Sequence, residues 1–231
     1  MNRLRPVIVA VLALAGTAAV PAVAAPRVEQ LVVFRNGDAE RDLIGTRATR
    51  VRVDGERCRV PRATPLAALV RSDVADVDIV DFSGSCDPSS LFVDAIGPNR
   101  NRGQSGWVYK VGNRQGSAAA SDPSGPFGTG RIKSGARVTW FYCVFAQGGC
   151  QRTLGLRVRE EGGGTVTARV SAYDDEGRGT RAANARVVAG GQSVQTDANG
   201  IATLTLPPGR HRVYAEKGGH IRSFPEKVRV G

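Results

Sequence analysis

Two stretches, GWVYKVGN at residues 106–113 and IKSGARVTWFYC at residues 132–143, decide the fold of this chain. In both, aromatic side chains recur at every second position (Trp107 and Tyr109, Trp140 and Tyr142), which is typical of β-strands. Glycine-containing turns border both stretches. The sequence therefore predicts a mostly β protein built around two aromatic strands. Four aromatic side chains would share one face of this strand pair: Trp107, Tyr109, Trp140 and Tyr142.

The first 24 residues have the layout of a secretory signal peptide. Arg3 and Arg5 precede an uncharged apolar stretch at residues 7–20, and the segment Ala22-Val23-Ala24 matches a small-x-small cleavage site. The apolar stretch is short for a membrane span, and no later segment approaches about 18 uninterrupted apolar residues. We expect residues 1–24 to be removed on export, no transmembrane segment to follow, and the protein to be secreted or associated with the cell envelope.

The chain has four cysteines, Cys58, Cys86, Cys143 and Cys150. An even number in an exported chain indicates two disulfides, for which three pairings are open. The six residues between Cys143 and Cys150 lie between two strand-like segments, and this spacing suits a bridge at the end of a hairpin. Cys58 then pairs with Cys86. We expect no metal site, because the chain lacks a C-x-x-C motif and its histidines lie far from the cysteines.

Basic residues exceed acidic ones, with a net charge of +11, and arginine supplies 28 of the 32 positive charges. Residues 27–161 hold 20 basic and 15 acidic side chains, and residues 162–231 hold 10 and 6. Along the sequence the excess is spread evenly, without the dense basic block and interleaved aromatics of a nucleic-acid groove. We therefore expect no nucleic-acid partner. The charge favours solubility or weak attraction to anionic polymers and lipid head groups.

The segment at residues 27–160 has the mixed texture of an α+β domain. Thr64 and Pro65 have the residue types of an N-cap and first helical position, which predicts a single main helix over residues 65–72. Short alternating segments before and after it predict several strands. Leu154, Leu156 and Val158 also alternate, so we expect this segment to pair with residues 138–145 in a hairpin whose tip holds the Cys143–Cys150 bridge.

Residues 161–164 are rich in glycine and predict a flexible linker. Beyond them, residues 165–231 show short alternating runs separated by turn signals such as TDANG at residues 196–200. Turns at this spacing predict a small all-β sandwich.

Both predicted domains resemble known families. Five segments follow one another over residues 51–142: VRVDG, TPLAALV, LFVDAIG, SGWVYKVGN and IKSGARVTWFY. With these segments in this order, the first domain resembles the C-terminal, β-grasp-like domain of transcobalamin and intrinsic factor, and a related bacterial family of unknown function. Residues 182–219 and the final VRV look like carboxypeptidase-regulatory or bacterial immunoglobulin-like modules. The first resemblance implies a β-grasp-like fold. The second implies an immunoglobulin- or transthyretin-like sandwich with a spacer or surface-binding role.

Both faces of residues 138–145 are apolar, and a sheet covered by one helix needs only one apolar face. The second face could be covered by the N-terminal strand, the long glycine-rich loop at residues 112–131, the second domain or a ligand. We therefore single out Trp107, Tyr109, Trp140 and Tyr142 as a candidate ligand face. If they bind a ligand, at least one tryptophan is accessible to solvent, and Trp107 is the candidate because the long loop follows its strand.

We find no constellation of catalytic residues in the sequence. All four cysteines are expected to be oxidised, and the two histidines, His211 and His220, flank one turn of the second domain. We expect a non-enzymatic binding or scaffolding protein of the cell envelope or extracellular space without a cofactor, whose partner is an envelope polymer or protein. Two alternatives remain open: a carrier of a corrinoid-like or other planar small molecule, and an accessory subunit of an extracellular hydrolase.

Overall fold

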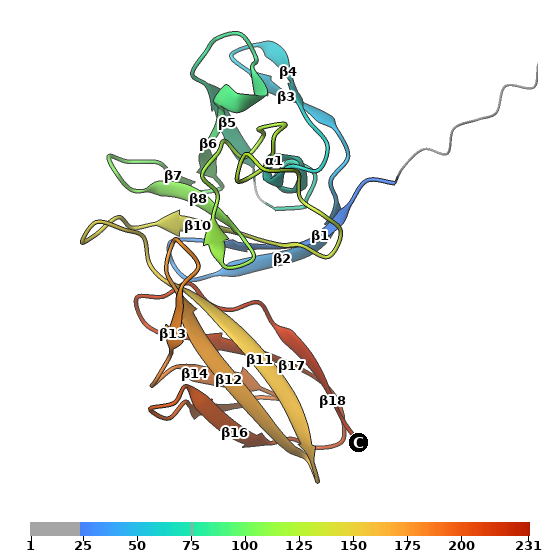
Figure 1. The fold of residues 1–231 in the computed structure, drawn as a ribbon, viewed down its shortest axis with the longest axis vertical. Coiled ribbons are helices and arrows are strands. Elements are labelled where there is room, and N and C mark those ends of the chain that lie inside the picture. Colours follow the sequence, from blue (N-terminus) through green and yellow to red (C-terminus); the bar gives the residue numbers. More distant parts are fainter. Residues whose placement is uncertain (1–23, 75) are drawn as a thin grey trace, which may run out of the picture.

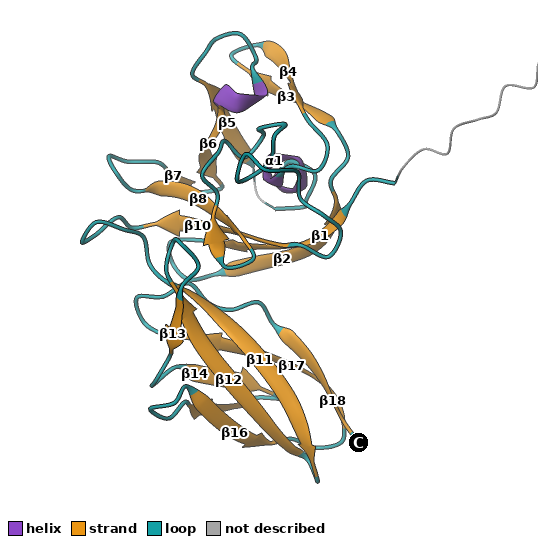
Figure 2. Cartoon of the chain, viewed as in Figure 1, coloured by secondary structure: helices purple, strands orange, loops and turns teal. Residues whose placement is uncertain are grey.

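The computed structural model describes residues 24–74 and 76–231 and is mostly β, with one α-helix and one 3-10 helix (Figures 1 and 2). The strands form two groups, β1–β10 and β11–β18, which we call the first and second halves. The predicted signal peptide, residues 1–24, lies outside the described residues except for its last residue. In the described part of the chain, no helix is long and apolar enough to cross a membrane.

A five-stranded mixed sheet forms the centre of the first half. The two aromatic strands, β8 (Gly106–Val111) and β10 (Arg137–Cys143), pair antiparallel, and β10 also pairs parallel with β1 (Arg27–Val33). The sheet is completed at its edges by β2 (Ala39–Gly45) and β9 (Arg114–Gln115). Both aromatic strands predicted from the sequence are therefore present and adjacent.

Two smaller sheets and the helix cover one face of this central sheet (Figure 2). Helix α1 (Pro65–Leu69) begins as predicted, because the Thr64 side chain accepts a hydrogen bond from the Ala67 N–H at 3.2 Å and Pro65 is the first helical residue. All five helical residues are buried. The remaining elements are β3 (Thr49–Val53), β4 (Glu56–Val60), β5 (Val77–Asp81), η1 (Pro88–Ser90), β6 (Leu91–Ile96) and β7 (Asn99–Arg100).

The second half is a sandwich of two four-stranded sheets with an apolar core between them. One sheet contains β11 (Thr153–Gly162), β12 (Thr165–Tyr173), β13 (Gly179–Arg181) and β16 (Ile201–Thr205). The other contains β14 (Arg186–Ala189), β15 (Gln192–Gln195), β17 (Gly209–Glu216) and β18 (Glu226–Val230). Inward and outward side chains alternate along these strands, which is the period-two pattern seen in the sequence.

Two predictions about the middle of the chain are wrong. Residues 154–159 belong to β11 and pair with β12, not with β10, whose neighbours are β1 and β8. The predicted linker at residues 161–164 is the turn of the β11–β12 hairpin, where Gly163 and Gly164 both have positive φ. A glycine-rich tight turn and a flexible linker have the same composition, so composition alone could not separate them.

Both predicted disulfides are present. Cys58 is bonded to Cys86 and Cys143 to Cys150, with Cα atoms 4.9 and 5.1 Å apart. The second bridge does not close a β10–β11 hairpin. It closes a short loop that follows β10, within which Ala146 and Gly149 form an isolated β-bridge.

The second half covers the second apolar face of β10. Ile221 and Phe224, from the segment between β17 and β18, pack with Leu31, Val33 and Phe141 of the central sheet. Ile221 also exchanges backbone hydrogen bonds with the start of β11. The sequence left four candidates for covering this second face, and in the structure the second half of the chain covers it.

A buried lysine lies at the same boundary. Lys110 points from β8 away from the aromatic face, and its Nζ donates to the Asp174 carbonyl at 2.7 Å and lies 3.3 Å from Asp175 Oδ1. Burial lowers the pKa of Lys110, and the nearby carboxylate of Asp175 opposes this effect. A second link runs from Arg137 of β10, whose guanidinium pairs with Glu226 of β18 and with Glu29 of β1.

Candidate functional site

The structure brings the four predicted aromatic residues together on one face of β8 and β10. Tyr109 lies directly opposite Trp140 and Trp107 opposite Tyr142, with ring centroids 5.3 and 5.9 Å apart. All four are buried in the core beneath α1. Trp107 is only 8% exposed and Trp140 2%, so neither tryptophan has the solvent exposure expected of an open ligand face. The strip is not an open platform, because the sheets and loop around it cover its rings.

Three of these aromatic side chains have their polar atoms satisfied by nearby backbone. Trp107 Nε1 donates to the Asn99 carbonyl at 2.7 Å, and the Tyr109 hydroxyl donates to the Ala118 carbonyl at 2.7 Å. The Tyr142 hydroxyl donates to the Arg100 carbonyl at 3.0 Å. Burial, with a smaller contribution from Asp122, raises the pKa of Tyr109, so this hydroxyl stays protonated as a donor.

Above this strip lies a mostly apolar pocket of about 260 Å³ between the β5–β6 sheet, β8 and residues 115–120. Trp107, Tyr109 and Trp140 line it from the core side, whereas Tyr142 does not. Phe82 and Phe92 also line the pocket, although they are 77% and 43% exposed. Their rings contact each other with centroids 5.1 Å apart. Exposed, paired phenylalanines beside an apolar pocket are typical of a binding site.

Two polar atoms of residues that line this pocket are buried without a hydrogen-bond partner among the described residues. They are the indole Nε1 of Trp140, a donor, and the side-chain Oε1 of Gln115, an acceptor. Most buried polar atoms in proteins are hydrogen-bonded, and an unpaired one costs free energy. Both residues belong to the pocket lining, and the two unpaired atoms themselves lie beneath its surface in the free protein.

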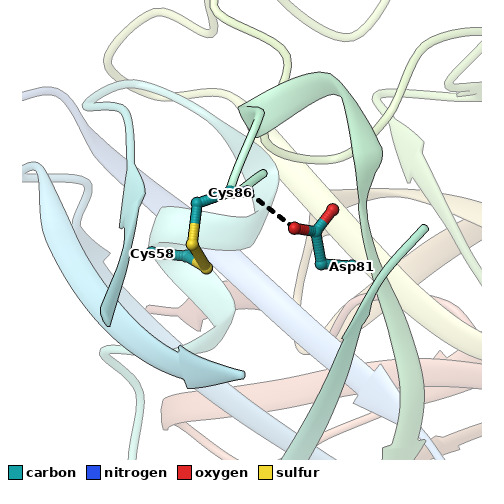
Figure 3. Close-up of side chains that lie close together, drawn as sticks. All are labelled: Cys58, Asp81 and Cys86. Carbon is teal, nitrogen blue, oxygen red and sulfur yellow. Dashed lines mark hydrogen bonds between the residues drawn. A yellow bond between two sulfur atoms is a disulfide. The ribbon is translucent and has the colours of Figure 1, made fainter. Parts of the chain in front are cut away.

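The loop that carries Phe82 is held by a single carboxylate. Asp81 accepts a hydrogen bond from the Cys86 N–H at 2.6 Å (Figure 3). It also accepts hydrogen bonds from the Ser90 hydroxyl and from the N–H and hydroxyl of Ser83. The Ser90 hydrogen bond, more than the others, holds the pKa of Asp81 well below its usual range. This network and the Cys58–Cys86 bridge fix the chain on both sides of Phe82.

Cys58, Asp81 and Cys86 lie close enough together for a three-ligand metal site (Figure 3). Both sulfur atoms are bonded to each other, however, and a thiolate is the form of cysteine that binds a metal. Only the carboxylate of Asp81 is left, and it is occupied by the loop. We therefore interpret this cluster as one that stabilises the loop.

The long glycine-rich loop forms one wall of the pocket. Its backbone is tied to the core, since the Leu66 N–H donates to the Ala120 carbonyl at 2.9 Å. Gly116 packs against the Tyr109 ring, and a Cβ atom at this position would lie 2.0 Å from Tyr109 Cζ. Only glycine allows this close approach. The composition of the loop thus serves packing around the aromatic strip.

Phe82, Phe92 and Gln115 were not predicted from the sequence. One of them carried a readable signal: in LFVDAI, Leu91 and Val93 alternate inward, which places the large aromatic Phe92 on the outward face of β6. Phe82 lies in a polar loop and Gln115 in a two-residue strand, where no periodicity marks them. The two histidines bond backbone carbonyls: His211 Nε2 lies 2.8 Å from the Pro207 oxygen and His220 Nδ1 3.0 Å from that of Gly218.

Comparison with known proteins adds no family to this picture. No protein-family model matches the chain, and no curated protein matches it either. The family resemblances described from the sequence therefore remain predictions, and the function has to be argued from the site.

Proposed function

We propose that this chain is an exported, non-enzymatic binding protein of the cell envelope or extracellular space, and that the aromatic pocket takes a small planar group of its ligand. One observation carries the proposal: an apolar pocket rimmed by exposed Phe82 and Phe92 has an unpaired donor on Trp140 and an unpaired acceptor on Gln115. A ligand with an aromatic ring and a hydrogen-bonding group would cover both phenylalanines, and it would pair both buried atoms once the Trp140 and Gln115 side chains turn toward it.

The size of the pocket limits the ligand. Pockets for drug-sized molecules hold roughly 300–1,000 Å³, and this one holds about 260 Å³. It suits a single aromatic side chain of a partner protein or a small bicyclic molecule. A corrinoid macrocycle is larger than the pocket, so the geometry favours a small planar group over a corrinoid.

The two disulfides support the proposed location, because such bridges form and persist in oxidising compartments. The signal-peptide pattern of residues 1–24 supports it independently.

A calorimetric titration of the mature chain with indole, 4-methylphenol and benzamide tests the proposal. We expect at least one of these probes to bind, and we expect Trp140→Phe and Phe82→Ala each to weaken its affinity about tenfold, as loss of one buried hydrogen bond or aromatic contact predicts. Phe145→Ala is the control for an exposed phenylalanine outside the pocket, because Phe145 is 40% exposed and does not line the pocket. Absence of binding by all three probes, or equal losses in Phe82→Ala and Phe145→Ala, would overturn the proposal.

A further inference from the structure

Three cross-strand pairs in the second half place a cation directly opposite a cation. Arg157 of β11 faces Arg169 of β12, and the β17–β18 pair adds two more: Arg210 with Arg229 and Arg212 with Lys227. All six side chains are exposed. Like charges directly opposite each other destabilise a sheet. Their repeated occurrence is a stability cost that the apolar core of this half does not require.

None of these six cations forms an ion pair among the described residues. Three carboxylates of this half are occupied elsewhere: Glu216 with Arg186, Glu226 with Arg137, and Asp174 with Arg178. The positive charge of the three pairs is therefore left uncompensated by the chain itself. An anionic partner would remove the repulsion on binding.

Three of the six cations line a cleft that holds about 510 Å³. Arg157 and Arg169 form one wall from the outer face of the β11–β12 hairpin, and Lys227 contributes from β18. The cleft also contains Arg137 and Glu226, which are already paired with each other. Because Lys227 lies opposite Arg212, the cationic lining continues from the cleft onto the outer face of β17–β18.

The spacing of these cations fits a chain of negative groups better than a single ion. Side chains directly opposite on paired strands lie about 5 Å apart at Cβ, and neighbours two residues apart on one strand lie about 7 Å apart. A small anion can meet two cations at most. A linear polymer with a charge every few ångströms can meet several in turn.

We propose that this cleft and the adjoining β17–β18 face bind a linear phosphate-bearing polymer. Five of the six cations are arginines, whose planar fork matches phosphate oxygens. Phosphate has enough oxygens to bridge the two guanidinium groups of a cross-strand pair, whereas one guanidinium uses both oxygens of a carboxylate. The site is separate from the aromatic pocket, which lies in the first half, and the proposal does not depend on the function proposed for that pocket.

The first half supplies a matched control. On the β3–β4 hairpin, Arg50 faces Arg59 and Arg52 faces Arg57, all exposed, so charge density there resembles that of β17–β18. Arg52 lines a different pocket, and none of these four arginines lines the 510 Å³ cleft. Comparing the two hairpins separates a built site from general attraction to a basic protein.

The test is fluorescence-anisotropy titration of labelled inorganic polyphosphate with the mature chain at several salt concentrations. We expect log K to fall with log salt with a slope of about −2 to −3, as three or four phosphate contacts predict. Arg157→Glu/Arg169→Glu should weaken binding at least about tenfold, and Arg50→Glu/Arg59→Glu, which changes the net charge equally, less than about threefold. Equal losses in the two double variants, or no binding at about 50 mM salt, would overturn the proposal.

Two further arms complete the test. The neutral variant Arg157→Gln/Arg169→Gln should raise the melting temperature of the free protein while it weakens binding, because it removes the cross-strand repulsion. This result excludes misfolding as the cause of lost affinity, and a lowered melting temperature would count against the repulsion argument. Single-stranded DNA with the same number of phosphates should bind no more tightly than polyphosphate. Much tighter binding would mean that bases are recognised, contrary to the proposal.

Discussion

The ammonium group of Lys110 lies 3.3 Å from Asp175 Oδ1 and connects the two halves of the chain across a buried boundary. The Lys110 side chain is fully buried, and its Nζ also donates to the carbonyls of Tyr173 and Asp174. A buried charge is tolerated only with such partners. The two halves are therefore held in one arrangement by polar contacts as well as by the Ile221 and Phe224 contacts.

Replacing this lysine should uncouple the halves. Lys110→Ala removes the donor to the Tyr173 and Asp174 carbonyls and the partner of the Asp175 carboxylate, and we expect a loss of about 3 kcal/mol in the free energy of unfolding. Urea unfolding followed by fluorescence and circular dichroism measures it, and the two signals should no longer coincide. Lys133→Ala, at an exposed position, should change stability by less than about 0.5 kcal/mol. Similar stabilities for the two variants would contradict the role assigned to Lys110.

Glu29 should make stability depend on pH in the acidic range. Burial raises the pKa of Glu29, but the ion pairs with Arg41 and Arg137 outweigh it, so the pKa is lowered from 4.5 in the folded protein. Since the unfolded chain binds the proton more tightly, the contribution of Glu29 is complete above pH 4.5 and is lost as the pH falls through the folded pKa.

We therefore expect Glu29→Gln to lower the free energy of unfolding by about 1 kcal/mol at pH 7 and by less at pH 3. Denaturant titrations of both proteins at the two pH values check this. The control is Glu40→Gln on β2, which should show little effect at either pH, because Glu40 forms no ion pair among the described residues. An equal effect of Glu29→Gln at both pH values would show that the carboxylate is not responsible.

The two disulfides should contribute unequally. Cys58 and Cys86 are 28 residues apart in sequence, and Cys143 and Cys150 are 7 apart. The chain-entropy argument gives about 3.5 kcal/mol for the longer loop and about 2.5 for the shorter. Paired replacement of Cys58 and Cys86 by alanine should also weaken ligand binding, because that bridge anchors the loop of Phe82. If the Cys143–Cys150 variant lost more affinity than the Cys58–Cys86 variant, this assignment would be wrong.

Local patterns predicted the strands well and their partners poorly. Alternation identified β8, β10 and β11, and the Thr64-Pro65 pair identified the start of α1. Alternation could not show that β10 pairs with β1 near the N-terminus, because a strand has the same period-two pattern whichever strand it pairs with. The β11–β12 turn was mistaken for a linker for the reason given above.

The two proposed sites differ in how far the sequence could reach them. Trp107, Tyr109 and Trp140 were found from their spacing, but the pocket above them depends on Phe82, which has no periodic signal. The cations were invisible as a cluster, because Arg212 and Lys227 are far apart in sequence and meet only through the strand register. Cations that are evenly spaced along the sequence come together on one surface because the strands pair.

The two tryptophans allow the most direct test of the pocket. The chain has only Trp107 and Trp140, so a ¹⁵N-correlated NMR spectrum shows two indole N–H signals. Trp107 Nε1 is already bonded to the Asn99 carbonyl, whereas Trp140 Nε1 has no partner among the described residues. On titration with a probe that binds, we expect the Trp140 signal to shift downfield and gain protection from exchange while the Trp107 signal stays in place. A Trp140 signal unmoved at saturation would contradict it.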